Sequence, residues 1–132
     1  MATPINEDGK FIDVSAAKKE IDGYIQHLRE EGKDPNQMAL GHIYGLDNVK
    51  QLMAFIEQYN SGGPKQPIEG IRLYLGWNSD SPHPDKTDLV FMPVTKDGKD
   101  LYPVYSGKEP EEEQDGGSTL AEGHPCPVWC FD

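Results

Sequence analysis

The spacing of apolar side chains changes once along this chain of 132 residues, and the change restricts the folds available to it. Up to about residue 62, apolar residues recur every three to four positions, which is the period of a helix with one buried face. From Ile68 they alternate with polar residues, which is the period of a half-buried strand. Helices followed by strands indicate an α+β fold with the helices on one face of an antiparallel sheet.

Two helices are predicted in the first half of the chain. The first is expected over Val14–Glu31, with Asp13 or Ser15 as its N-cap. Its apolar stripe consists of Val14, Ala17, Ile21, Tyr24, Ile25 and Leu28. The second helix is expected to be capped by Asp47, and its apolar positions are Val49, Leu52, Met53, Ile56 and Tyr59. Between the helices, Met38–Gly45 is apolar without a clear period, so a buried strand and an irregular turn both remain open.

Strands are predicted in the second half. In Ile68–Trp77, the face that we expect to be the core side carries Ile71, Leu73, Leu75 and Trp77. Arg72 and Tyr74 point to the opposite face. A second strand is expected over Asp88–Thr95, and an Asp-Gly turn then leads to a short third strand over Leu101–Tyr105.

The length suits one domain, residues 1–132, with a helical part at 13–62 and a sheet part at 68–105. Residues 106–123 are acidic and poor in apolar side chains, so we expect a flexible acidic loop there. Residues 124–132 are rich in Trp, Phe and Cys, so we expect this tail to dock back. The predicted fold is α+β: two N-terminal helices packed on a small antiparallel sheet of three or four strands, with the Cys-rich tail docked onto it.

The charge balance limits the partners. Twelve Lys and Arg against 23 Asp and Glu give a net charge of -11, which repels nucleic acid and suits a basic protein partner. The first residues do not resemble a signal peptide, so we expect a cytoplasmic protein. The longest apolar run, Met38–Tyr44, is far shorter than the roughly 20 residues that cross a bilayer, so no membrane role is expected.

The most chemical pattern in the chain is His124-x-Cys126-x3-Cys130. These three side chains could hold a zinc ion together with a fourth ligand, for which His42, His83 and Asp132 are candidates. The cysteines could also form a disulfide, although a cytoplasmic protein keeps its thiols reduced. The favoured interpretation is that both thiols are small buried apolar groups beside Trp129, with no cofactor.

Motifs for catalysis are missing from the sequence: it has no P-loop, no nucleophile elbow and no H-E-x-x-H pattern. The loop at 78–86 contains His83, and the aspartates around it, Asp80, Asp85 and Asp88, could gather a hard cation. Because their spacing is not that of a calcium loop, a solvated loop is the favoured interpretation.

Three segments carry a resemblance to a known group of proteins. They are Gly70–Leu75 with the sequence GIRLYL, Leu89–Val94 followed by Asp97-Gly98, and Pro125–Cys130 with the sequence PCPVWC. Together they resemble small uncharacterised bacterial proteins with a G-I-R-[IL]-Y strand, an L-V strand ending in an Asp-Gly turn, and a terminal P-C-P-x-x-C motif. The resemblance implies the same two-helix and sheet architecture, and it implies no activity and no catalytic residue.

These observations favour a small soluble non-catalytic protein-interaction module, in its most specific form an acidic inhibitor or immunity-type protein. The residues expected to bind the partner are Arg72, Tyr74, Glu111, Glu112 and Glu113. The alternative is a metal-binding or thiol-redox protein that uses His124, Cys126 and Cys130.

Overall fold

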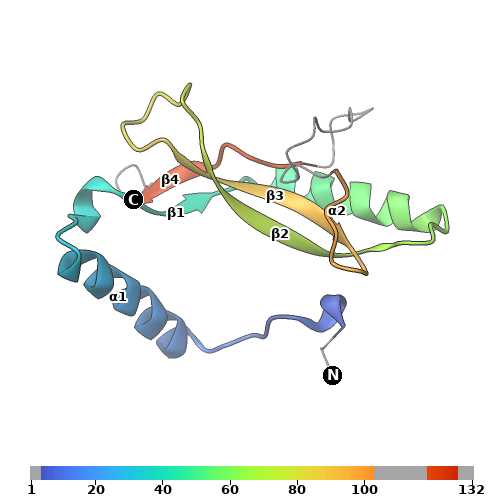
Figure 1. The fold of residues 1–132 in the computed structure, drawn as a ribbon, viewed down its shortest axis with the longest axis horizontal. Helices are drawn as coiled ribbons and strands as arrows, with labels where there is room; N and C mark the ends of the chain where they lie inside the picture. Colours follow the sequence, from blue (N-terminus) through green and yellow to red (C-terminus); the bar gives the residue numbers. More distant parts are fainter. Residues whose placement is uncertain (1–3, 103–118, 128–132) are drawn as a thin grey trace.

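The fold is described from a computed structural model, which covers residues 4–102 and 119–127 (Figure 1). The elements in chain order are the 3-10 turn η1 (Ile5–Glu7), helix α1 (Val14–Glu30), the 3-10 turn η2 (Pro35–Gln37), strand β1 (Ala39–Ile43), helix α2 (Leu46–Ser61), and strands β2 (Ile68–Trp77), β3 (Thr87–Thr95) and β4 (His124–Pro127). The prediction of an α+β protein with two helices and antiparallel strands is confirmed, but the described residues form two sheets of two strands each rather than one sheet of three or four.

The larger sheet is the pair β2 and β3, which run antiparallel with Ile71 opposite Pro93 and Leu75 opposite Leu89. A register shift between Ile68 and Gly70 bends the start of β2. Directly opposed residues of an antiparallel pair point to the same face, so Ile71 and Leu75 of β2 share one face of this sheet with Pro93 and Leu89 of β3.

The segment between the two helices belongs to a second sheet. Residues Ala39–Ile43 form strand β1 rather than an irregular turn. β1 pairs antiparallel with β4, with His42 opposite Pro125 and Ile43 opposite His124. Residues 128–132 lie outside the described part, so the docking of the tail as a whole remains a prediction.

The third strand expected over Leu101–Tyr105 is not formed in its described part. Gly98, with φ of +83°, turns the chain back, and the Thr95 amide donates to the Lys99 carbonyl at 2.8 Å. The Leu101 amide reaches the Pro93 carbonyl at 2.9 Å, but only an isolated bridge joins Asp100 to Val94. A second isolated bridge joins Leu120 to Phe91 on β3, so two short segments share the edge expected for one strand.

The core lies between α2 and the first half of the larger sheet. Its buried residues are Leu52 and Ile56 of α2 and Ile68 of β2. Around them pack Phe55, Tyr59, Ile71, Phe91, Leu101 and Leu120. The Asn60 side chain exchanges two hydrogen bonds with the backbone of Ile68, at 2.8 and 2.9 Å, and so ties the end of α2 to the start of β2.

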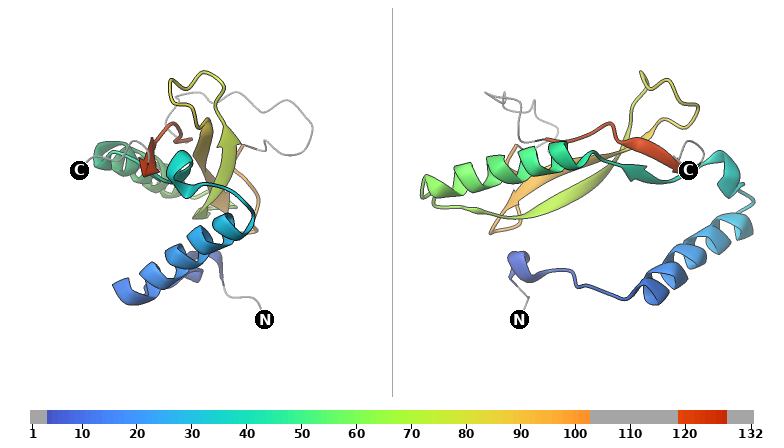
Figure 2. Two further views of the ribbon diagram at one scale, coloured as in Figure 1. Left: turned by 90° about the vertical axis from the view of Figure 1, so that its left-hand side faces the viewer. Right: turned by 180° about the vertical axis from the view of Figure 1, so that it is seen from behind.

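Helix α1 does not pack on the sheet, contrary to the prediction. The Asp13 side chain caps it as expected, accepting the Ala16 amide at 2.7 Å. The helix lies apart from the sheets and joins the rest through η2, whereas α2 crosses one face of the β2–β3 sheet (Figures 1 and 2). Leu28 is its one buried residue, while Val14 and Ile21 are 85% and 57% exposed.

The second half of β2 also differs from the prediction. Leu73, Leu75 and Trp77 were expected in the core, but they are 50%, 87% and 70% exposed. They share a face with Ile71, which does contact the core. Helix α2 therefore covers this face of β2 only near its beginning, and the row of apolar side chains continues into the open.

Candidate functional site

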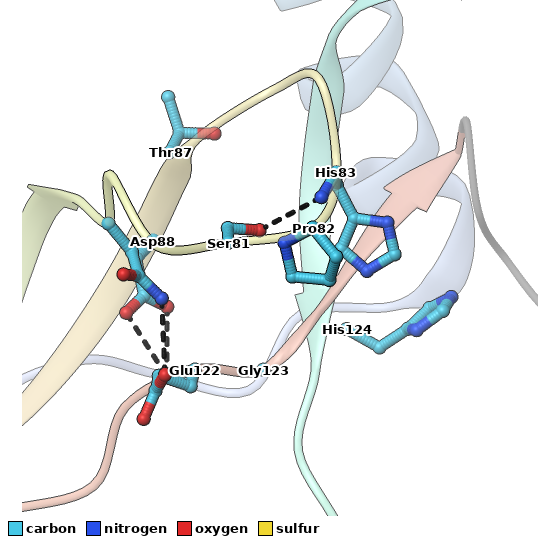
Figure 3. A pocket seen from close by; sticks show the side chains of 9 residues that line it. Ser81, Pro82, His83, Thr87, Asp88, Glu122, Gly123 and His124 are labelled. Carbon is cyan, nitrogen blue, oxygen red and sulfur yellow. Dashed lines mark hydrogen bonds between the residues drawn. The ribbon is translucent and has the colours of Figure 1, made fainter.

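A pocket of about 250 Å³ lies where the loop after β2, the start of β3 and residues 122–124 meet (Figure 3). It is lined by Asn78, Ser81, Pro82, His83, Thr87, Asp88, Glu122, Gly123 and His124. Several of these residues are far apart in the sequence, so the pocket depends on the way in which the two sheets are brought together.

Asp88 organises this pocket. Its carboxylate is 6% exposed and accepts the backbone N–H of Glu122 with both oxygens, at 3.0 and 3.1 Å. It also accepts its neighbour's amide, that of Leu89, at 2.9 Å. The hydroxyl of Tyr44 lies within reach of the carboxylate, at 3.3 Å, and of the Leu89 carbonyl. Backbone amides thus compensate the burial of the charge.

Tyr44 is held in its neutral form. Burial, and next the negative charge of Asp88, raise the pKa of Tyr44 to about 12. At neutral pH the phenol is therefore a hydrogen-bond donor. Together, Tyr44 and Asp88 join the end of β1 to β3 and to residue 122.

Two histidines face the same pocket from different elements. The ring centroids of His83, in the loop, and His124, in β4, are 5.6 Å apart, and the rings meet edge to face. Figure 3 shows both imidazoles on one side of the pocket, away from Asp88. The structure thus brings His124 together with one of its three proposed fourth ligands. His42, another of them, has Nε2 2.9 Å from the Thr87 carbonyl.

The acidic residues near the loop do not converge. Asp85 accepts the Ala39 amide at 2.6 Å and the Thr87 amide at 2.9 Å. Burial acts to raise the pKa of Asp85, but these hydrogen bonds and that of the Thr87 hydroxyl outweigh it and lower the pKa below its ordinary value. Among residues 4–102 and 119–127, no three His, Cys, Asp or Glu side chains form a metal-binding group.

Only one of the two cysteines lies among the described residues. Cys126 lies in β4 with its backbone opposite Gly41, and Cys130 lies outside the described residues. The zinc, disulfide and packing interpretations therefore all remain predictions. Glu111, Glu112 and Glu113 also lie outside the described residues.

Arg72 and Tyr74, both expected to bind a partner, converge on Asp100. Arg72 Nη1 lies 2.6 Å from a carboxylate oxygen of Asp100, Nη2 donates to the Gly98 carbonyl at 3.0 Å, and the Tyr74 hydroxyl donates to the second oxygen. The Asp100 side chain is 6% exposed, and that of Arg72 is 43% exposed. The Tyr74 hydrogen bond and the Asp100 charge raise the pKa of Arg72 above its ordinary value. This cluster ties the turn after β3 to β2, and its role in binding remains a prediction.

Sequence patterns assigned the apolar side chains of β2 to the core and did not indicate that some of them form an exposed surface. A groove of about 530 Å³ runs between α2, η1 and the start of β2, with Met53, Ile56, Ile68 and Ile71 among its lining residues. Leu73, Leu75 and Trp77 extend the apolar row beyond it. β3 pairs with one edge of β2, and no strand within the described residues pairs with the other edge.

Comparison with known proteins finds no family model, no curated protein and no solved structure that matches the chain. None of the helices in residues 4–102 and 119–127 is long and apolar enough to span a membrane.

Proposed function

We propose that this protein is a small non-catalytic interaction module that binds a protein partner along β2. The observation that carries the proposal is the row Leu73, Leu75 and Trp77, at least half exposed on a strand of which one edge is paired by no strand in residues 4–102 and 119–127. A long apolar edge strand is usually protected by charge, proline or a covering segment, because it otherwise pairs with other chains. The ten residues of β2 contain no proline and no lysine.

Strand addition is the mode of recognition that fits this surface. The backbone groups of an edge strand hydrogen-bond to an extended segment, and side chains on alternate positions select the sequence. η1 flanks the start of β2, since a Cβ atom on Gly70 would come within 2.7 Å of the Ile5 side chain. The part open to a partner is therefore Arg72–Trp77, which includes Arg72 and Tyr74.

Charge supports a basic partner. The net charge of -11 favours encounter with a positively charged protein, and the acidic run at 109–115 concentrates that charge in one segment. An inhibitor or immunity-type role follows the same logic, since such proteins cover the basic surface of their target. The pocket supports a non-catalytic role, because Asp88 and Tyr44 are both used to hold backbone segments together.

The test is site-specific photo-crosslinking from position 75 in cells that make the protein, followed by identification of the captured protein. Leu75→Glu should abolish binding of that purified partner, whereas Leu46→Glu, at another exposed leucine, should not. Equal binding by both variants would disprove the role of β2. Binding that weakens steeply with salt would support the basic character of the partner.

A second candidate function, zinc binding at the tail, is favoured by the contact of His83 with His124. The protein would hold zinc through these rings together with Cys126 and Cys130. Zinc affinity, measured by competition with a chromophoric chelator, should then fall at least tenfold in His83→Ala and stay unchanged in His27→Ala, an exposed histidine of α1. Absence of stoichiometric zinc binding by the reduced wild-type protein would remove this candidate.

A further inference from the structure

The edge of β2 that is turned away from β3, here called the open edge, presents the backbone groups of Leu73. On β3, Phe91 donates its amide to the Leu120 carbonyl at 2.7 Å and accepts the Leu120 amide at 3.2 Å. The N–H and C=O of Phe91 therefore point away from β2. Leu73 lies directly opposite Phe91. In an antiparallel ladder, two opposed residues that exchange no hydrogen bond both direct their backbone groups outward, so those of Leu73 point to the open edge.

The next two residues of the exposed apolar row share this orientation. Leu75 and Trp77 follow Leu73 at every second position, so their backbone groups point to the open edge and their side chains lie on the same face. Pro93 fits the pattern, because it lies opposite Ile71, where the ladder requires no N–H from β3. The residues that offer hydrogen bonds at the open edge are thus the residues that expose apolar side chains.

A strand added at this edge has to match both features. Successive side chains of a strand point to opposite faces, so only every second residue of the added strand lies beside the apolar row. The residues between them lie on the other face, which carries the polar side chains of Arg72 and Tyr74. An added strand therefore fits best if its apolar residues alternate with polar ones along Leu73–Trp77.

An acidic hollow lies beside the start of the same strand. Its volume is about 430 Å³, and its charged lining residues are Asp8, Glu69 and Arg72. Arg72 has an ion-pair partner of its own, whereas Asp8 and Glu69 form no ion pair within the part of the chain that the structure describes. Glu69 precedes Leu73 by about 13 Å along the strand. A segment that continues past Leu73 therefore brings a long basic side chain to this hollow.

We propose that β2 binds an extended segment of its partner in which apolar residues occupy every second position and Lys or Arg residues flank them. This selectivity rests on the proposed function, to which it adds the pattern of the partner's sequence. The apolar residues cover Leu73, Leu75 and Trp77, and the backbone of the segment completes the hydrogen bonds of the open edge. The basic side chains enter the hollow beside Asp8 and Glu69, and acidic segments are repelled there.

Three synthetic peptides test the proposal before the partner is known. The probe is Arg-Arg-Val-Thr-Val-Thr-Val-Arg-Arg. One control peptide has Glu in place of every Arg, and the other, Arg-Arg-Val-Val-Val-Thr-Thr-Arg-Arg, keeps the composition but loses the alternation. In the variant Trp129→Phe, Trp77 is the only tryptophan, and contact with the probe should shift its fluorescence to shorter wavelength.

The probe should bind more tightly than either control peptide by a factor of about ten or more. Equal affinities of the probe and the peptide without alternation would overturn the proposal, because plain charge attraction would then explain the binding. Absence of a fluorescence shift at about 1 mM probe would overturn it as well.

Paired substitutions separate the acidic hollow from the overall charge of the protein. Asp8→Asn combined with Glu69→Gln should weaken binding of the probe by a factor of about five. Glu20→Gln combined with Glu57→Gln removes the same charge at exposed positions of α1 and α2, and should change the affinity by less than about twofold. Equal effects of the two pairs would contradict the role of the hollow.

The selectivity of the edge and the proposed function can fail separately. Leu75→Glu should abolish binding of the probe, whereas Leu46→Glu should preserve it. If the partner captured from position 75 is lost in Leu75→Glu while the probe does not bind the wild type, the partner uses β2 but the alternating segment is wrong. If the probe binds with the expected selectivity and no protein is captured, the segment is right and the role in cells is wrong.

Discussion

The ring of Tyr44 lies so close to Gly123 that a Cβ atom at position 123 would come within 2.6 Å of Cε1 and Cζ. The same ring meets that of Phe91 with a centroid distance of 4.7 Å. Tyr44 therefore fills the space between the end of β1, the middle of β3 and the segment that enters β4. The connection between the two sheets depends on a residue without a side chain at position 123.

Gly123→Ala tests this packing. The added methyl group would also come within 2.8 Å of the Ile43 carbonyl, a backbone atom that cannot rotate away. We expect a loss of about 1 to 3 kcal/mol in the free energy of unfolding, measured by urea denaturation. Gly41→Ala is the matched control, because nothing lies within 4 Å of a Cβ atom there. Equal effects of the two substitutions would contradict the close packing.

The raised pKa of Tyr44 predicts sensitivity to alkali. Tyrosine in an unfolded chain has a pKa near 10, whereas Tyr44 in the folded protein has a pKa of about 12. The stability from this group is therefore complete below pH 10 and is lost as the pH rises to 12. Tyr44→Phe should flatten the fall of the free energy of unfolding in that interval. It should also remove a phase near pH 12 from the absorbance titration at about 295 nm.

The lowered pKa of Asp85 predicts a loss of stability at acidic pH. Its folded pKa lies below that of an unfolded aspartate, near 3.9, so its contribution is present above that pH and is lost as the pH falls below it. The wild type should therefore be more stable than Asp85→Asn at pH 7, and the difference should shrink toward pH 3. Asp80→Asn, at an exposed loop position, is the control. A difference that stays constant with pH would exclude this linkage.

Arg72→Ala should destabilise the turn after β3, because Asp100 is left nearly buried without its guanidinium partner. Loss of charge-assisted hydrogen bonds of this kind costs about 1 to 2 kcal/mol. Arg29→Ala, on the exposed side of α1, should change the free energy of unfolding little. If Arg72→Ala is as stable as the wild type but loses the partner, Arg72 acts in recognition rather than in holding the turn.

Local patterns were sufficient to predict that the two helices and the long strands exist. The expected cap of α2 was wrong, because Asp47 lies inside its first turn and Gly45 stands at the N-cap position. The apolar period and the Asp13 cap placed α1 to within one residue at its end, since Glu30 rather than Glu31 is the last helical residue. The alternation in β2 was likewise visible in the sequence. These features depend on neighbours three, four or two residues away, which sequence patterns describe directly.

Packing between distant segments could not be predicted in this way. The exposure of Leu75 depends on how far α2 reaches along β2, and the exposure of Val14 depends on the path of the chain between η1 and α1. In the pocket, the contact of Asp88 with Glu122 spans 34 residues. The meeting of His83 with His124 is equally non-local, and no spacing rule connects either pair.

The two isolated bridges on the outer edge of β3 hold the chain both before and after residues 103–118. The Leu101 amide donates to the Pro93 carbonyl and Leu120 pairs with Phe91, so the described residues on either side of 103–118 are both held on the same edge of β3. The piece that follows is anchored by its own contacts, through Leu120, Glu122 and the pairing of β4 with β1. A chain cut between residues 103 and 118 should therefore give two fragments that find each other again. The short one would act as a peptide ligand that completes the second sheet.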